Sequence, residues 1–178
     1  SAASDVYKRQ VKDKSTVIFC TSVDHADKIA ELLRNNGVKA ESVSGKTENS
    51  KRKQILKDYE NKKIKVLCAC DLLNEGWDSP ITEVLFMARP TMSKTIYMQQ
   101  LGRGMRIHEG KEFLMVFDFV DNANMFNCPY SLHRILNISE YVPGGMVLGT
   151  KHGMSWDKDM FKHGDKPTVC LLYTSDAA

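Results

Sequence analysis

The sequence has no hydrophobic run that approaches the length of a membrane span, so nothing in it predicts a membrane partner. Its five cysteines form no spaced framework, and we expect reduced thiols in a cytoplasmic protein. Cys68 and Cys70 are close together, but no second Cys or His pair follows at ligand spacing, so we expect no metal site. The formal charge of +3 permits a nucleic-acid partner without requiring one.

The two ends of the chain differ from the rest. Residues 1–10 read SAASDVYKRQ, and residues 170–178 read CLLYTSDAA. A DNA sequence that encodes the first segment also encodes the second when its reverse complement is translated. That DNA resembles the transposon end used to prepare sequencing libraries. We therefore assign both segments to adapter-derived sequence, expect them to pack against nothing, and expect a gene fragment that lacks its natural termini.

Between these ends, short apolar runs alternate with amphipathic stretches. The first run, TVIFCT, is typical of a strand buried on both faces, and the next segment carries apolar residues at helical spacing before a stop at Asn36-Gly37. Alternation of this kind predicts an α/β fold with a mostly parallel central sheet, whose ligands and motifs lie beyond the carboxyl ends of the strands. The predicted strands cover residues 16–21, 38–43, 65–70, 83–88 and 113–120, and the predicted helices cover residues 23–36, 49–60 and 93–102.

The strongest chemical signal is QQLGRGMR at residues 99–106. Gln99, Arg103 and Arg106 are spaced i, i+4, i+7, so on a helix they share one face. The planar guanidinium suits phosphate oxygens, and two of them at a cleft stabilise charge that develops on a transferred phosphoryl group. The alternative is a solvated basic helix with surface ion pairs.

The same segment carries signals for how its helix docks. We expect an apolar stripe of Met98, Leu101 and Met105 to pack on the sheet. Gly102 and Gly104 cost helix stability, so they predict a close approach of the backbone to a neighbour.

The second signal is CDLLNEGWD at residues 70–78, directly after a predicted buried strand. It places carboxylates and a glycine at a strand end, where nucleotide and nucleic acid would bind. The alternative is an ordinary acidic loop. We expect Trp77 to pack over the domain surface, with stacking on a base as the open alternative.

These two segments resemble motifs VI and V of superfamily 2 helicases, and residues 16–22 with the following helix resemble motif IV. The three occur in the family's order and spacing, and their wording is most similar to DNA repair and restriction-type DEAD/DEAH-box helicases. The resemblance implies a RecA-like three-layer domain, the C-terminal motor domain of such an enzyme, over residues 11–121. Residues 122–169 are then a truncated C-terminal appendage.

The resemblance also implies roles for single residues. Arg103 and Arg106 look like arginine fingers, and Gln99 would contact the γ-phosphate or the attacking water. The ATP-binding positions would be Gly76, Asp78 and Gly102.

The implied nucleic-acid contacts come from the strand-end loops. Cys70 departs from the family, which commonly has Thr or Ser there, and a thiol is the weaker donor. A backbone N–H contact is what we expect at that position. The full implied set is Thr21, Ser22, Gly45, Lys46 and Cys70.

One further segment, Gly45-Lys46-Thr47, looks like the end of a P-loop. A P-loop needs a glycine five positions before Gly45, and Ala40 stands there instead. Glu41 would also put a carboxylate among the phosphates. We interpret the segment as a loop near the nucleic-acid track.

A P-loop, an acidic Mg²⁺ motif and a general base for water are all missing from the sequence. We therefore expect ATP and Mg²⁺ to be bound mainly by an N-terminal RecA-like domain, in cis, and the fragment to be inactive alone. DNA is the expected nucleic acid. Two alternatives to this interpretation are a motor-like nucleic-acid-binding module without ATPase activity and a small-molecule enzyme on a flavodoxin-like sheet. The sequence lacks the glycine-rich cofactor loop that the second alternative would need.

Overall fold

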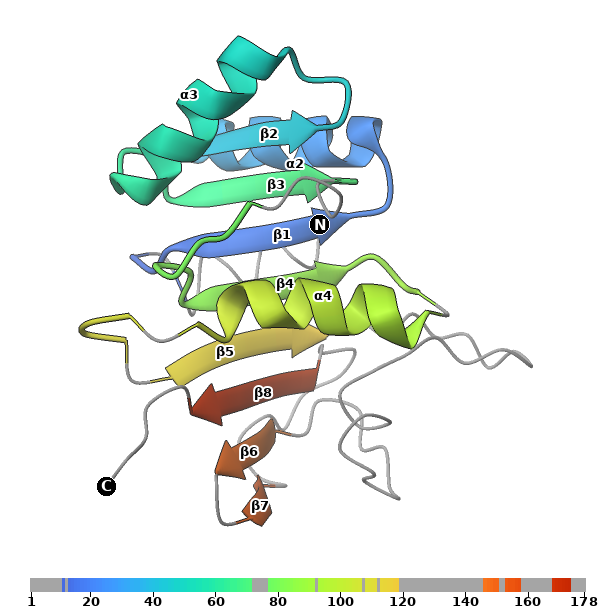
Figure 1. Ribbon diagram of the computed structural model, residues 1–178, viewed down its shortest axis with the longest axis vertical. Helices are drawn as coiled ribbons and strands as arrows, with labels where there is room; N and C mark the ends of the chain where they lie inside the picture. Colours follow the sequence, from blue (N-terminus) through green and yellow to red (C-terminus); the bar gives the residue numbers. More distant parts are fainter. Residues whose placement is uncertain are drawn as a thin grey trace.

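The computed structural model describes residues 11, 13–71, 77–91, 93–106, 108–111 and 113–118, together with the backbone of strands at 146–150, 153–157 and 168–173. Within these residues the strands form an eight-stranded sheet in the order β2-β3-β1-β4-β5-β8-β6-β7 (Figure 1).

The first five strands are all parallel to one another. Each of these five strands and the three helices among them lies within two residues of its predicted bounds at either end, so the predicted α/β fold with a mostly parallel sheet is confirmed. The strands are β1 (Thr16–Cys20), β2 (Ala40–Ser44), β3 (Val66–Cys70), β4 (Val84–Ala88) and β5 (Phe113–Asp118), and the helices are α2 (Val23–Asn35), α3 (Asn49–Glu60) and α4 (Lys94–Gly104).

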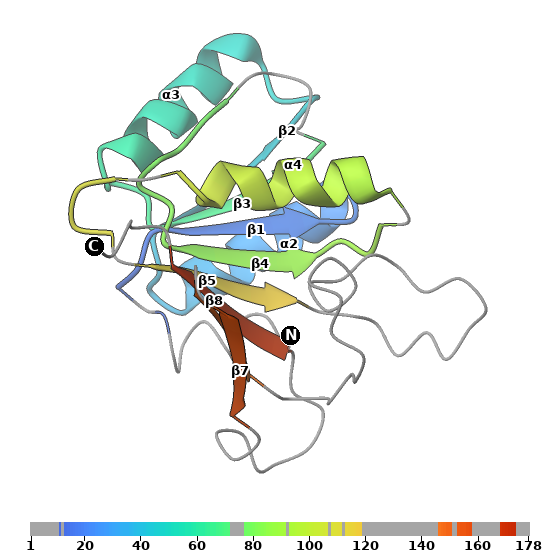
Figure 2. The same ribbon diagram turned by 60° about the horizontal axis from the view of Figure 1, so that its bottom comes forward.

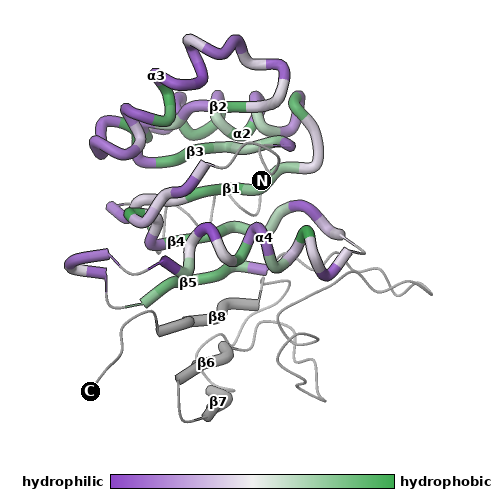
Figure 3. The backbone as a smooth tube through the Cα atoms, viewed as in Figure 1, coloured by the Kyte–Doolittle hydropathy of each residue, from purple (hydrophilic) through white to green (hydrophobic). Residues whose placement is uncertain are grey.

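The helices cover both faces of the parallel sheet and make three layers. Helix α2 packs on one face, and α3 and α4 pack on the other (Figure 2). Strands β1 and β3 are buried along their whole length, which explains why they read as continuous apolar runs. In Figure 3 the central strands are coloured mostly as hydrophobic, and helix α3 is coloured mostly as hydrophilic.

Helix α2 illustrates how local sequence sets an element. Ser22 caps its start, with the Oγ accepting a hydrogen bond from the amide of His25 at 3.1 Å. The apolar residues that recur at helical spacing are all buried on its inner face; they are Ala26, Ile29, Ala30 and Leu33. At its end Gly37 adopts φ +78°, its amide donates to the Arg34 carbonyl, and the Val38 amide donates to Leu33. This pair of bonds is a Schellman motif, which needs the left-handed conformation that glycine adopts readily.

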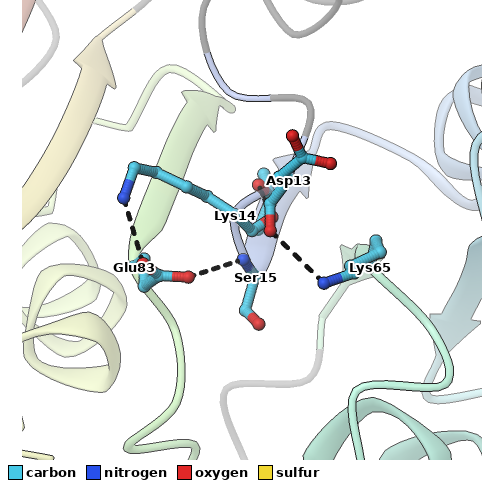
Figure 4. Close-up of polar contacts among 6 residues, drawn as sticks. Asp13, Lys14, Ser15, Lys65 and Glu83 are labelled. Carbon is cyan, nitrogen blue, oxygen red and sulfur yellow. Dashed lines mark hydrogen bonds and ion pairs between the residues drawn. The ribbon is translucent and has the colours of Figure 1, made fainter. Parts of the chain in front are cut away.

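Polar contacts join the amino ends of the central strands (Figure 4). Glu83, just before β4, accepts from the Lys14 ammonium and from the Ser15 amide, each at 3.1 Å. Lys65, just before β3, donates to the Asp13 carbonyl at 3.3 Å. The starts of β1, β3 and β4 are therefore held in register at one edge of the sheet.

The C-terminal strands correct one expectation. Strand β8 (Thr168–Tyr173) pairs antiparallel with β5, and β6 (Met146–Thr150) joins β8 to β7 (Gly153–Asp157). Residues 170–173 therefore pack against β5, and the expectation that the terminal segments pack against nothing is wrong for them. A sheet edge offers unpaired N–H and C=O groups that accept any extended chain, whatever the origin of its side chains. Residues 1–10 and 174–178, with most of 122–169, lie outside the described residues.

Candidate functional site

Helix α4 carries the two motif arginines to the amino edge of the sheet. Ser93 caps its start, where its Oγ accepts from the Ile96 amide at 3.3 Å. Because α4 connects the parallel strands β4 and β5, it runs back from their carboxyl ends to their amino ends (Figure 1). The prediction that every motif lies at the carboxyl ends is therefore wrong for Arg103 and Arg106.

The second arginine also lies beyond the helix. Helix α4 ends at Gly104 and Met105 caps it, so Gln99 and Arg103 share a helical face and Arg106 does not. The predicted i, i+4, i+7 face is corrected accordingly. Gln99 is exposed, one turn before Arg103.

The docking face of α4 differs from the predicted stripe. Leu101 is buried as expected, but Met98 and Met105 are 39% and 46% exposed. The buried positions are Tyr97, Gln100, Leu101 and Gly104.

Gly104 provides the close approach that its sequence position predicted. A Cβ there would lie 2.8 Å from the Cδ1 atoms of both Leu85 and Leu114, which are fully buried on β4 and β5. The last turn of α4 therefore presses its backbone onto the sheet. Gly102, the other predicted position, is exposed and has nothing within 4 Å of such a Cβ.

One aromatic and one acidic side chain lie close to the two arginines. The guanidinium of Arg103 lies 6.0 Å from the ring centroid of Trp77, and Arg106 Nε lies 2.8 Å from Asp78 Oδ1. Trp77 is only 8% exposed and meets Tyr59 edge-on, with ring centroids 6.1 Å apart, so it packs on the domain as predicted. Burial lowers the pKa of Arg103, an effect that Asp78 opposes and Arg106 reinforces. Gly76, the remaining predicted ATP contact, lies outside the described residues.

A lysine that the sequence analysis did not single out lies beneath this group. Lys111 is 6% exposed, and its ammonium donates to the carbonyls of Gly104, Arg106 and Pro80. Burial lowers the pKa of Lys111 to about 8, against the raising effect of Glu83 and then Asp78. No sequence pattern marks a buried lysine, since lysine is among the residue types least often buried.

The predicted nucleic-acid contacts lie at the opposite, carboxyl edge. Thr21 and Ser22 are exposed after β1, and Gly45 and Lys46 are exposed after β2. The Thr21 hydroxyl lies 3.0 Å from His25 Nδ1, while the Ser22 hydroxyl caps α2. These hydroxyls hold local structure and still face solvent.

The loop after β2 is a closed turn. The Thr47 amide donates to the Ser44 carbonyl at 3.1 Å, and the Lys46 amide donates to the Ser44 hydroxyl at 3.2 Å. The Ser44 amide in turn donates to the Thr47 hydroxyl at 3.0 Å. Amides engaged in this way cannot cradle phosphates, which agrees with our rejection of a P-loop at this position.

A groove runs beside that turn, between the start of α2 and the end of β2. Its volume is about 340 Å³. Lys46 and Lys51 line it together with Asp27, Glu41 and Glu48, so its charge is mixed.

Cys70 does not face the nucleic-acid edge with its side chain. It is 1% exposed and packs in the core beneath α2, and its thiol lies 3.5 Å from Asp71 Oδ2. Burial, followed by the charge of Asp71, raises the pKa of the Cys70 thiol. A side-chain contact of Cys70 with nucleic acid is therefore excluded in this conformation, because the last residue of β3 points inward.

Asp71, the next residue, has an unusual backbone. Its φ is +57°, and its carboxylate accepts from Arg89 at 2.5 Å. The hydrogen bond from Arg89 lowers the pKa of Asp71. Neither residue was among the predicted site residues, although an aspartate directly after a buried strand is a signal that could have marked one of them.

The family described as the helicase conserved C-terminal domain matches residues 2–108, more than half of the chain. The chain belongs to this family. The match begins inside the segment that we assigned to adapter-derived sequence and ends just after the second arginine.

Similar proteins include irc3 of Schizosaccharomyces pombe, which carries the name of a mitochondrial ATP-dependent helicase. It is 40% identical over 61% of this chain, and the match covers 18% of irc3. IRC3 of Saccharomyces cerevisiae is 31% identical over 67% of this chain and 18% of its own length. This helicase domain therefore spans about a fifth of the length of these two relatives.

Solved structures agree on the fold. The C-terminal domain of the DEAD-box protein Dbp5 has a TM-score of 0.63 at 19% identity, over 78% of each chain. Domain 2 of Mss116p, solved with an RNA duplex, has a TM-score of 0.55 at 22% identity and covers 62% of this chain and 45% of its own. The RecA-like α/β fold is thus confirmed.

Among the described helices, none is long and apolar enough to cross a bilayer. The predicted cytoplasmic location stays a prediction, since one relative is mitochondrial by name.

Proposed function

We propose that this helicase domain is the C-terminal half of the motor of a longer ATP-dependent DNA helicase or translocase. An N-terminal RecA-like domain of the same protein would bind ATP and Mg²⁺ with its own P-loop and acidic motif. This chain would supply Arg103 and Arg106 as arginine fingers, with Gln99 directed to the γ-phosphate or the attacking water. Its nucleic-acid contacts would come from Thr21, Ser22, Gly45 and Lys46, and from the backbone at Cys70.

The observation that carries the proposal is the separation of these two groups. The arginines converge with Asp78 and Trp77 at the amino edge of the sheet, and the candidate nucleic-acid loops lie at the carboxyl edge. Two guanidiniums at one edge suit a phosphoryl-transfer site that a second domain completes. Exposed hydroxyls and a lysine at the other edge suit a phosphate backbone.

The test uses the full-length helicase with Arg106→Ala and Arg106→Lys. Loss of an arginine finger lowers phosphoryl-transfer turnover by on the order of 10³-fold or more, and a point charge does not replace the planar fork. Both variants should therefore lose DNA-stimulated ATP turnover. Affinity for single-stranded DNA without nucleotide should stay within a few-fold of the parent protein.

Arg34→Ala is the matched control. Arg34 lies in the last turn of α2, on the other face of the sheet, where it contacts Glu41 at 3.7 Å. This control should keep full turnover. If Arg106→Ala instead abolishes DNA binding and spares turnover, the α4 end faces the nucleic acid and the proposed assignment is wrong.

A simpler test uses the 178-residue chain by itself. Without the phosphate cradle and the Mg²⁺ ligands of the N-terminal domain, it should show no DNA-stimulated ATP hydrolysis. Turnover by the purified chain that exceeds turnover by its Arg103→Ala variant would show that this chain holds a complete site.

A further inference from the structure

Lys111 is placed to hold two separate segments together. It follows the turn after α4, where its amide donates to the His108 carbonyl at 3.0 Å. Its side chain points back under the helix end, so that the buried ammonium meets carbonyl oxygens of both the α4 end and the segment before β4.

The three carbonyl acceptors belong to different parts of the structure. Gly104 is the last residue of α4, and its carbonyl is one of those that a helix end leaves without an intrahelical donor. The Arg106 carbonyl, 3.0 Å from the ammonium, belongs to the second arginine itself. The Pro80 carbonyl, at 3.4 Å, lies two residues after Asp78.

The Lys111 ammonium is thus buried, whereas an ion pair between the same two segments is exposed to solvent. In that pair Arg106 Nε lies 2.8 Å from Asp78 Oδ1, and the two side chains are 62% and 35% exposed. An exposed pair of this kind does little to fix two segments, because solvent screens it. A buried cation that donates to backbone oxygens on both segments fixes their distance, and it also complements the negative end of the α4 dipole.

We propose that Lys111 is a positioning residue for the Arg106 finger: it fixes the backbone on which that arginine is carried and sets it against the segment that holds Asp78. The proposal rests on the finger role given to Arg106 above. Lys111 touches no reacting atom. It acts because the guanidinium must meet the transferred phosphoryl group at a fixed place, and a misplacement of about 1 Å can cost about 10²-fold in rate.

The test measures DNA-stimulated ATP turnover by the full-length helicase. Lys111→Met removes the donors and keeps a stem of similar shape, and Lys111→Gln keeps uncharged N–H donors on a shorter stem. Each variant should lower kcat by roughly 10- to 100-fold, with KM for ATP within about threefold, since the finger contributes mainly in the transition state. Lys94→Met is the control: Lys94 is exposed at the far end of the same helix, and its loss should leave kcat unchanged.

The deciding readout is a double-mutant cycle with Arg106→Ala. Once the finger is absent there is nothing to position, so either Lys111 substitution should cost less than about threefold in the Arg106→Ala background. A purely structural lysine would cost the same factor in both backgrounds. Thermal melting selects which of the two Lys111 variants is folded and used, and the cycle can be completed with either.

The outcomes separate this inference from the function on which it rests. If Arg106→Ala keeps full turnover, the finger assignment is wrong. If Arg106→Ala loses turnover while the folded Lys111 variant keeps it, or loses it by the same factor in both backgrounds, only the positioning role is wrong. Strong coupling between the two residues supports both.

Discussion

Asp78 and Arg106 form an ion pair between two loops that the fold brings to the same edge of the sheet, with Asp78 Oδ1 2.8 Å from Arg106 Nε. One residue ends the acidic segment after β3, and the other follows the cap of α4. Both side chains are open to solvent, so the pair contributes to orientation more than to stability. In a closed nucleotide site the same carboxylate would hold the guanidinium until phosphate oxygens compete for it.

The first prediction follows from that exposure. Asp78→Asn removes the charge of one partner and should lower the free energy of unfolding by less than about 1 kcal/mol, as exposed ion pairs do. Urea denaturation of the chain measures it. Asp24→Asn is a matched control, since Asp24 forms an exposed pair with Lys28 at 2.8 Å. A loss of several kcal/mol for Asp78→Asn alone would mean that the pair carries the fold of this edge.

The second prediction compares two glycines of α4. Gly104→Ala puts a Cβ 2.8 Å from the buried Leu85 and Leu114 side chains, so overpacking should destabilise the chain by about 1–3 kcal/mol. Gly102→Ala meets nothing within 4 Å on an exposed helix face, and the gain in helix propensity should stabilise it by about 0.5–1 kcal/mol. Denaturation midpoints of the two variants should move in opposite directions. If both move upward, the core beneath Gly104 yields and the close approach is not required.

The periodicity of apolar residues predicted the helices well where their inner faces are apolar. In α2 all four expected positions are buried. In α4 the buried face includes Gln100 and Gly104, and the expected methionines are exposed, so hydrophobicity alone selected the wrong stripe. The glycine in the same segment still predicted the close backbone approach at Gly104, because the lack of a Cβ is a local signal.

Three features depend on tertiary structure and were not predicted. The edge at which Arg103 lies follows from the direction of α4 between two parallel strands, which the motif does not contain. The burial of Lys111 follows from carbonyl oxygens supplied by two distant segments. The inward direction of Cys70 likewise follows from the register of β3 against its neighbours.

The third prediction concerns pH. Burial lowers the pKa of Lys111 to about 8 from an ordinary value of 10.5. Between these two values the unfolded chain binds more protons than the folded chain, so the Lys111 contribution makes the free energy of unfolding rise with pH. The rise begins near pH 8 and is complete above the ordinary lysine pKa. It reflects relief from a buried charge, at about 1.4 kcal/mol for each unit of pKa shift.

Urea denaturation between pH 7 and pH 11 measures this linkage. Lys111→Met should remove the rise, and Lys39→Met, which changes an exposed lysine, should keep it. Because other groups titrate in the same range, the difference between parent and variant is the quantity to follow. An identical pH dependence in the parent and in Lys111→Met would show that the ammonium is solvated.

The last prediction concerns the other edge of the sheet. Lys46 is exposed on the turn after β2 and lines the groove beside α2, where it can contact a backbone phosphate. In the full-length helicase, Lys46→Gln should weaken binding to single-stranded DNA and reduce the slope of log affinity against log salt by about 0.7, the value for one phosphate contact on a single strand. Fluorescence anisotropy titrations over a range of salt concentrations give that slope.

The control and the second readout distinguish this role from a general loss of positive charge. Lys53 is exposed on α3 and lies outside the groove lining, so Lys53→Gln should leave the slope unchanged. ATP turnover at saturating DNA should be the same in both variants, because Lys46 lies at the carboxyl edge and the arginines lie at the amino edge. If Lys46→Gln leaves the slope unchanged, the strand does not pass over this turn. If it lowers turnover at saturating DNA, the two edges are not separate in function and the division on which the proposed function rests is wrong.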